Sequence, residues 1–210
     1  YYIDAARLNL GLFQPDINVI WDLAPHDLSI LLYILGQDAL EVSARGSANV
    51  RPGIHDVAYL EVRFPNNILA HLHLSWLDPC KVRRITIVGS KKMVVCNDLS
   101  DTEKIRVYDK GVDYPVETDQ FNQFHLQYRY GAVHIPWVPF REPLRVQCEH
   151  FLDCIHTGAR PCSDGVSGLK VVQVLEQADR SLQLGGIPQG IAQRVDHAPL
   201  IEMVMQSAAD

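Results

Sequence analysis

The sequence lacks the features that mark nucleic-acid-binding and membrane-spanning proteins. Its 19 Lys and Arg residues are outnumbered by 25 Asp and Glu residues, so the net charge is -6, and no run of basic residues occurs. Its longest apolar runs, such as residues 30–35, are far too short to span a bilayer. We therefore expect neither a nucleic acid nor a membrane as a partner.

Glycine motifs that hold nucleotides are also absent. The chain has no GxGxxG and no GxxxxGK[ST], and so contains no recognisable cradle for a dinucleotide or a phosphate chain. It has no GxSxG either, which argues against a serine hydrolase of the nucleophile-elbow type.

Cysteine is sparse and shows no metal-binding or redox pattern. The 5 Cys residues include no CxxC pair. Cys148 and Cys154 fall in a helical pattern, where they fit the role of small apolar residues better than that of ligands or a disulfide. This usage suits a reducing compartment, and we expect a cytoplasmic protein.

What the sequence does contain is the alternating pattern of a sheet. We expect strands at residues 1–10, 40–48, 57–64, 68–76, 82–89, 93–96 and 105–108. Short turns such as residues 65–67 imply hairpins and hence antiparallel pairing. One face is apolar, and the other carries Tyr59, Glu61, Arg63, His71 and His73. The pattern predicts an α+β fold: an open, mainly antiparallel sheet with helices packed on one face.

Three helices are expected around this sheet. The first would begin near Asp16 and end at Gly36, with Pro25 kinking it or splitting it at Ala24. The second spans residues 143–157 and the third residues 164–184. For the second helix we expect a buried apolar stripe made of Leu144, Cys148, Phe151, Leu152 and Ile155. The aromatic, proline-rich stretch 110–141 has no periodicity, and its rings are expected to pack on another surface.

The first helix carries the main candidate site. Asp22 and His26 are one helical turn apart and so share a face, if the helix is continuous. Imidazole titrates near neutral pH and could take a proton from an alcohol beside a carboxylate. Arg7 and Asn9 alternate on one strand face just before this helix and could contact a polar substrate. A surface pair, a core histidine, or a metal site that also uses Asp27 are the alternatives for the helical pair.

Two other groups of residues could bind ligands. His71 and His73 share a strand face and could chelate a metal, although a polar or interface face explains them better. Lys81, Arg83 and Arg84 could contact a phosphorylated substrate, although strand ends often carry such charges.

Three blocks in this order resemble the C-terminal part of a known family. They are WDLAPHDLSILLYILG, SWLDPCKVRRITIVGSKKM and EPLRVQCEHFLDCIHTGARPCSDGVSGLKVVQVLEQADRSLQLGG. Together they resemble the glucose-fructose oxidoreductase / inositol dehydrogenase (Gfo/Idh/MocA) family from about residue 7 to residue 186. The similarity is greatest to the branch associated with nucleotide sugars.

The resemblance implies a piece of a longer enzyme. Residues 1–186 would be a C-terminal substrate-binding and oligomerisation domain, and residues 187–210 a tail. The Rossmann domain that binds NAD or NADP, with the lysine of its Glu-Lys-Pro motif, would lie outside this chain. By the same resemblance the polar sheet face would join the subunits of a homo-oligomer.

The resemblance also implies a reaction. His26 would accept the hydroxyl proton of a sugar or nucleotide sugar while a hydride passes to the nicotinamide, and Asp22 would orient the imidazole or bind a neighbouring hydroxyl. The chain would be an NAD(P)-dependent dehydrogenase only when joined to its Rossmann domain, and inactive alone. A non-catalytic assembly or ligand-binding module that keeps the fold is the alternative, and a metal-dependent hydrolase is third.

Overall fold

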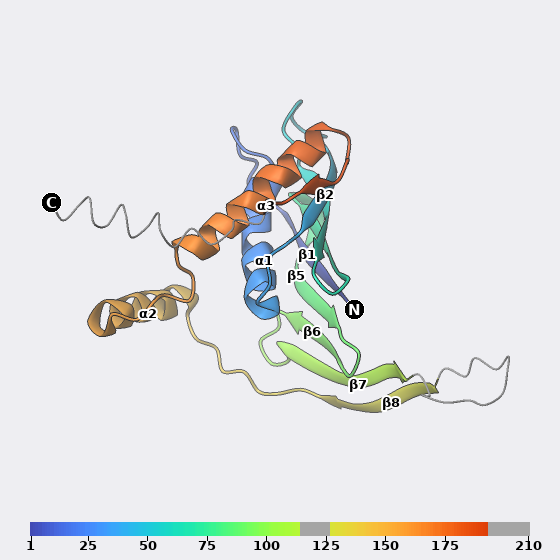
Figure 1. The fold of residues 1–210 in the computed structure, drawn as a ribbon, viewed down its shortest axis with the longest axis vertical. Helices are drawn as coiled ribbons and strands as arrows, with labels where there is room; N and C mark the ends of the chain where they lie inside the picture. The colour runs from blue at the N-terminus through green and yellow to red at the C-terminus, as the bar shows by residue number, and fades with distance from the viewer. Residues whose placement is uncertain (114–126, 193–210) are drawn as a thin grey trace.

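A computed structural model describes residues 1–113 and 127–192 (Figure 1). These residues form one nine-stranded sheet with the order β8-β7-β6-β5-β1-β4-β3-β2-β9. The strands are β1 (Tyr2–Leu10), β2 (Glu41–Ser47), β3 (Val57–Phe64), β4 (Ile68–Ser75), β5 (Leu77–Val88), β6 (Met93–Asn97), β7 (Ile105–Asp113), β8 (Gln127–His134) and β9 (Gln189–Gly190). The helices are α1 (Val19–Leu35), α2 (Pro143–Thr157) and α3 (Gly165–Gln183).

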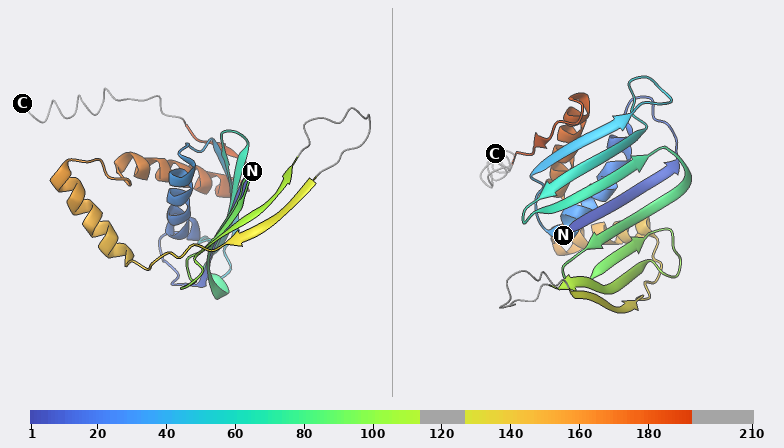
Figure 2. Two further views of the ribbon diagram at one scale, coloured as in Figure 1. Left: turned by 90° about the horizontal axis from the view of Figure 1, so that it is seen from below. Right: turned by 90° about the vertical axis from the view of Figure 1, so that its right-hand side faces the viewer.

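The prediction of an open, mainly antiparallel sheet with helices on one face is confirmed. Figure 2 shows α1 and α3 against the same face of the sheet. One pairing was not expected: β1 lies parallel to β4, with Tyr2 opposite Leu69, and antiparallel to β5. The chain therefore leaves β4 at Ser75, crosses the end of β1 at Trp76 and returns along its other edge as β5.

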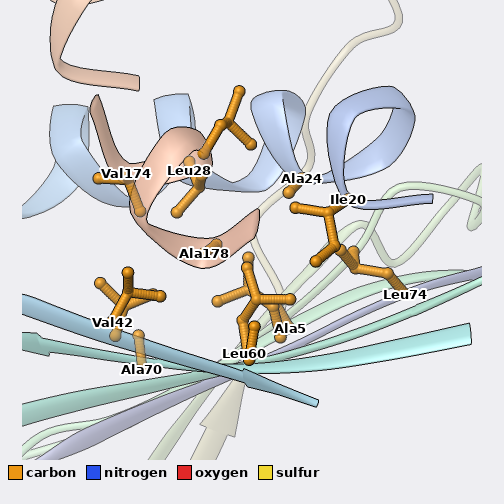
Figure 3. Packing of buried hydrophobic residues seen from close by; sticks show 14 of the residues in the cluster. Ala5, Ile20, Ala24, Leu28, Val42, Leu60, Ala70, Leu74, Val174 and Ala178 are labelled. Atoms are coloured by element: carbon orange, nitrogen blue, oxygen red, sulfur yellow. The ribbon is translucent and has the colours of Figure 1, made fainter. Parts of the chain in front are cut away.

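The core fills the space between the sheet and the two helices that cover it (Figure 3). Leu60, Leu72 and Leu74 are fully buried from the sheet side, and Leu28 and Leu31 from α1. Each such leucine contributes roughly 1.5–3 kcal/mol through the apolar surface it removes from water. The predicted apolar face is therefore the inner one.

Helix α1 is continuous, which keeps the shared-face argument for the candidate site valid. It begins two residues later than expected, because Asn18 rather than Asp16 accepts the backbone N–H groups of Ile20 and Trp21. It passes through Pro25 without splitting and ends at Gly36, whose φ of 59° is left-handed. No helix within the described ranges has the length and apolarity needed to cross a bilayer.

Helix α2 departs from the sequence-based expectation. Leu144 is 68% exposed and Phe151 is 62% exposed, and of the helix's residues Cys154 alone is buried. In Figure 2 the helix stands away from the sheet, so its apolar stripe meets no core within the described part of the chain. The periodicity correctly predicted an apolar face, but the expectation that this face is buried is wrong in this structure.

The aromatic segment also differs from expectation. Strand β7 runs on to Asp113, and β8 pairs with it, where no strand was expected. Tyr130, Trp137 and Phe140 are exposed, and Tyr130 stacks on its neighbour Tyr128 with ring centroids 6.5 Å apart, so these rings are not buried against a core in the described residues. Phe121 and Phe124 lie outside the described residues. The boundary expected at residue 186 stays a prediction; β9 pairs with β2 beyond it, and residues 193–210 are outside the described range.

Candidate active site

The candidate site forms where the inner face of β1 meets the first half of α1. Arg7 points from β1 to Asp27 on α1, and its Nε and Nη2 donate to the two carboxylate oxygens at 2.9 and 2.8 Å. Asp27 is only 2% exposed, and the side chain of Arg7 is 15% exposed. A two-point bond of this kind fixes both orientation and distance. The pair therefore locks α1 to the sheet beside His26.

Asp22 is held by a different part of the sheet, the crossing between β4 and β5. The indole Nε1 of the buried Trp76 donates to Asp22 Oδ2 at 2.8 Å, at the point where the chain crosses the end of β1. Gly11 keeps the space for that ring, because a Cβ there would lie 3.0 Å from Trp76 Cδ1. Phe13 packs edge-on against the indole with ring centroids 5.6 Å apart. The carboxylate of Asp22 is thus positioned by a rigid partner.

His26 is exposed and lies within the electric field of these groups. Partial burial of the ring is the largest cause that lowers the pKa of His26 below its ordinary value of 6.5, followed by the positive charge of Arg7. Arg83 lowers this pKa further, while Asp27 and, more weakly, Asp22 oppose the shift. The lowered pKa favours the neutral imidazole, which is the form that can accept a proton.

The four residues expected from the sequence lie close together, though not as a single hydrogen-bonded group. Asp22 and His26 occupy successive turns of α1, and Arg7 lies beneath them on β1. Within residues 1–113, no hydrogen bond joins Asp22 to His26. Asn9 follows Arg7 on the same strand face, and its amide lies beside Gly11.

Sequence reasoning missed two residues of this arrangement. Asp27 had been considered only as a metal ligand, yet both of its oxygens accept bonds from Arg7. Trp76 lies at the end of the expected strand 68–76 and had no predicted role in the site, yet it donates to Asp22. The position of Asp27 next to His26 in the sequence was the signal that could have identified Asp27. The contact of Trp76 with Asp22 depends on where the chain crosses the end of β1, and periodicity does not reveal this crossing.

The two other ligand-binding candidates have structural partners. His71 Nδ1 lies 3.0 Å from Asp4 Oδ1, and Tyr59 stacks on His73 with ring centroids 4.4 Å apart. Arg83 pairs with Asp98 at 3.6 Å. In the part of the chain that the structure describes, no group of three or more His, Cys, Asp or Glu residues could hold a metal ion.

A cavity of about 700 Å³ lies along the second half of α1 and the start of α3. None of the four expected site residues lines it. Its polar lining includes Gln37, Cys162 and the ion pair between Lys170 and Asp38, whose atoms are 2.6 Å apart.

Comparison with known proteins shows what the chain is similar to. Residues 14–95, which contain α1 with both Asp22 and His26, match the family model of the GFO/IDH/MocA C-terminal domain. The chain is 27% identical over 184 residues to UDP-N-acetylglucosamine 3-dehydrogenase of Acidithiobacillus ferrooxidans, covering 81% of this chain and 51% of that protein. The chain thus spans about half the length of this curated relative. The resemblance seen in the sequence is confirmed.

Solved structures show the same fold. The crystal structure of the Acidithiobacillus enzyme has a TM-score of 0.67 at 25% identity, covering 88% of this chain and 55% of that one. An oxidoreductase domain protein from Kribbella flavida gives 0.69 at 17% identity, covering 91% and 58%. GenD2 from gentamicin A biosynthesis, in complex with NAD, gives 0.67 at 15% identity, covering 92% and 56%. At such low identity the last two show the fold alone.

Proposed function

We propose that this chain, part of which matches the GFO/IDH/MocA C-terminal domain, is the substrate-binding half of an NAD(P)-dependent oxidoreductase that acts on a hydroxyl of a sugar or nucleotide sugar. The observation that carries the proposal is His26: a solvent-accessible imidazole whose pKa is lowered by partial burial of the ring and by Arg7, inside the segment that matches the family model. The relative that is a UDP-N-acetylglucosamine 3-dehydrogenase supports a nucleotide sugar as the substrate class.

His26 would act as the proton acceptor. Oxidation of an alcohol releases the hydroxyl proton, and a neutral imidazole within hydrogen-bond reach can take it. Because Asp22 is bound to Trp76 and not to the imidazole, we assign Asp22 to a hydrogen bond with a neighbouring sugar hydroxyl. Arg7 and Asn9 would contact the substrate from the strand below, with Arg7 oriented by Asp27.

The cofactor does not fit the residues of this chain. The sequence has no glycine-rich cradle. The N-termini of α1, α2 and α3, which could otherwise bind a pyrophosphate, are already capped by the side chains of Asn18, Glu142 and Asp164. We therefore propose that NAD or NADP is held by an N-terminal domain outside residues 1–210, and that this chain alone is inactive.

Self-association through the outer face of the sheet is part of the same proposal. That face exposes Tyr2, Tyr59 and Leu69, which a monomer would leave in water. All five cysteines are free thiols, which supports a reducing compartment, and we place the protein in the cytoplasm.

The test is turnover by the full-length protein that contains this chain. UDP-N-acetylglucosamine and NAD or NADP are supplied, and formation of the reduced cofactor is followed. His26→Ala should lower kcat by about 10²–10⁴-fold, as expected for loss of a general base. His134→Ala, on exposed β8, is the matched control and should leave kcat unchanged. An unchanged kcat in His26→Ala would remove His26 from the reaction, and an inactive native protein would favour the assembly or ligand-binding module.

A further inference from the structure

The end of α2 and the loop after it bring one imidazole and two thiols together. His150 Nε2 lies 3.1 Å from Cys162 Sγ and 3.6 Å from Cys154 Sγ. The backbone N–H of Cys162 also donates to His150 Nε2, at 3.2 Å. These contacts are remote from the candidate active site on β1 and the first half of α1, so nothing in the proposed function uses them.

The hydrogen bond from the backbone determines what the imidazole can do. A nitrogen that accepts an N–H carries a lone pair and no proton, so in the neutral ring the proton resides on Nδ1. The same lone pair is within reach of the Cys162 thiol. His150 can therefore accept the thiol proton and leave a thiolate, which is the reactive form of cysteine.

The two sulfurs differ in their access to solvent. Cys162 is exposed and contributes to the lining of the 700 Å³ cavity, whereas Cys154 is 9% exposed. Both sulfurs lie within 3.6 Å of the same nitrogen, so they are neighbours across the imidazole, and a disulfide between them requires their α-carbons to be within about 7 Å. An accessible thiol beside a base, with a shielded second thiol close by, is the arrangement of a redox-sensitive pair.

We propose that Cys162 is a peroxide-modified cysteine and that Cys154 closes a disulfide with it. The Cys162 thiolate attacks hydrogen peroxide: an S–O bond forms, the O–O bond breaks, and the departing oxygen takes the proton from His150 and leaves as water. Cys162 becomes a sulfenic acid, oxidised by two electrons, and the peroxide is reduced by two. Cys154 then attacks the Cys162 sulfur: the S–S bond forms, the S–O bond breaks, and the hydroxyl leaves with the Cys154 proton as a second water.

The disulfide would have a structural consequence. Cys154 belongs to the last turn of α2, and Cys162 lies just before Asp164, which caps α3. The new bond would tie α2 to the segment that leads into α3 and lines the cavity. This inference does not depend on the proposed dehydrogenase activity.

The experiment treats the reduced full chain with hydrogen peroxide, alkylates the remaining thiols with iodoacetamide and maps the peptides by mass spectrometry. We expect two of the five thiols to be lost and a peptide pair joined through Cys154 and Cys162. In Cys154→Ser the reaction should stop at the sulfenic acid on Cys162, which dimedone traps. His150→Gln should slow oxidation of Cys162 at least about tenfold.

Cys148→Ser supplies the matched control, because Cys148 is an exposed cysteine on the same helix without the imidazole contact. It should leave the rate and the disulfide unchanged. Circular dichroism establishes that each variant is folded. Oxidation of Cys148 or Cys80 as fast as Cys162, an unchanged rate in His150→Gln, or zinc retained by the purified protein in place of the disulfide would each overturn the proposal.

Discussion

Arg7 and Asp27 form a two-point ion pair between β1 and α1, with N···O distances of 2.9 and 2.8 Å. The pair is buried next to an exposed histidine, and its positive partner lowers the pKa of that histidine, His26. The pair therefore holds the helix in place, and its Arg7 adds to the effect of partial burial on the pKa of the candidate base.

Removing only one member of this pair should be costly. Arg7→Met leaves the Asp27 carboxylate buried without its partner, and the free energy of unfolding should fall by about 3–5 kcal/mol. The double variant Arg7→Met with Asp27→Leu should recover much of that loss, because no unpaired charge remains. Urea denaturation of the four members of the cycle measures the coupling.

The surface pair between Arg63 and Glu41, at 3.9 Å, is the control for this cycle. Arg63→Met should change the free energy of unfolding by at most about 1 kcal/mol, because that pair is largely solvated. Equal losses in Arg7→Met and Arg63→Met would show that burial of the Arg7–Asp27 pair has no energetic consequence.

Trp76→Phe tests whether Asp22 is positioned by the indole. The variant keeps most of the ring packing but removes the donor to Asp22 Oδ2. We expect a loss of about 1–2 kcal/mol in the free energy of unfolding, since the carboxylate is only partly buried and water can replace the donor. Under the proposed function, KM for the sugar substrate of the full-length protein should rise more than kcat falls.

Trp137→Phe is the matched control for that experiment, because Trp137 is exposed and lies outside the candidate site. It should change neither stability nor KM. If Trp76→Phe were equally silent, the assignment of Asp22 to a substrate hydroxyl would lose its structural basis.

Much of the fold could be predicted because alternation along a strand is a local property. The range 57–64 was expected and is β3, and Ala58, Leu60, Val62 and Phe64 are all buried as the pattern requires. The parallel pairing of β1 with β4 could not be predicted in this way, because it joins residues far apart in the sequence and depends on the crossing at Trp76.

In the candidate site, too, local spacing was predictable and long-range contacts were not. Spacing along one helix was enough to bring Asp22 and His26 to one face. Their actual partners, Trp76 and Arg7, come from strands and were not predictable from helical spacing. Helix α2 shows the converse: its periodicity correctly marks an apolar stripe, but periodicity carries no information about which surface covers Phe151.

The outer face of the sheet should mediate self-association. Tyr59 lies there, exposed and stacked on His73. Tyr59→Glu would bury a carboxylate in the proposed interface, and the dissociation constant should rise by about tenfold or more, since each 1.4 kcal/mol corresponds to about one factor of ten. Sedimentation velocity over a concentration series measures it.

Tyr33→Glu is the comparison for this variant, because Tyr33 is exposed on α1, on the helical side of the sheet. It should leave the association unchanged. A native chain that is monomeric at all concentrations would refute the outer-face interface.

The central claim is that partial burial and the charges of Arg7 and Arg83 lower the pKa of His26 and so favour its neutral imidazole, and NMR titration of the ring tests this most directly. We predict a pKa below 6.5 in the native chain, an increase in Arg83→Gln because the Arg83 charge lowers it, and a decrease in Asp22→Asn because the Asp22 charge raises it. Arg63→Gln, on the opposite face of the sheet, should have no effect. A native pKa at or above 6.5 that is insensitive to both Arg83→Gln and Asp22→Asn would contradict the account.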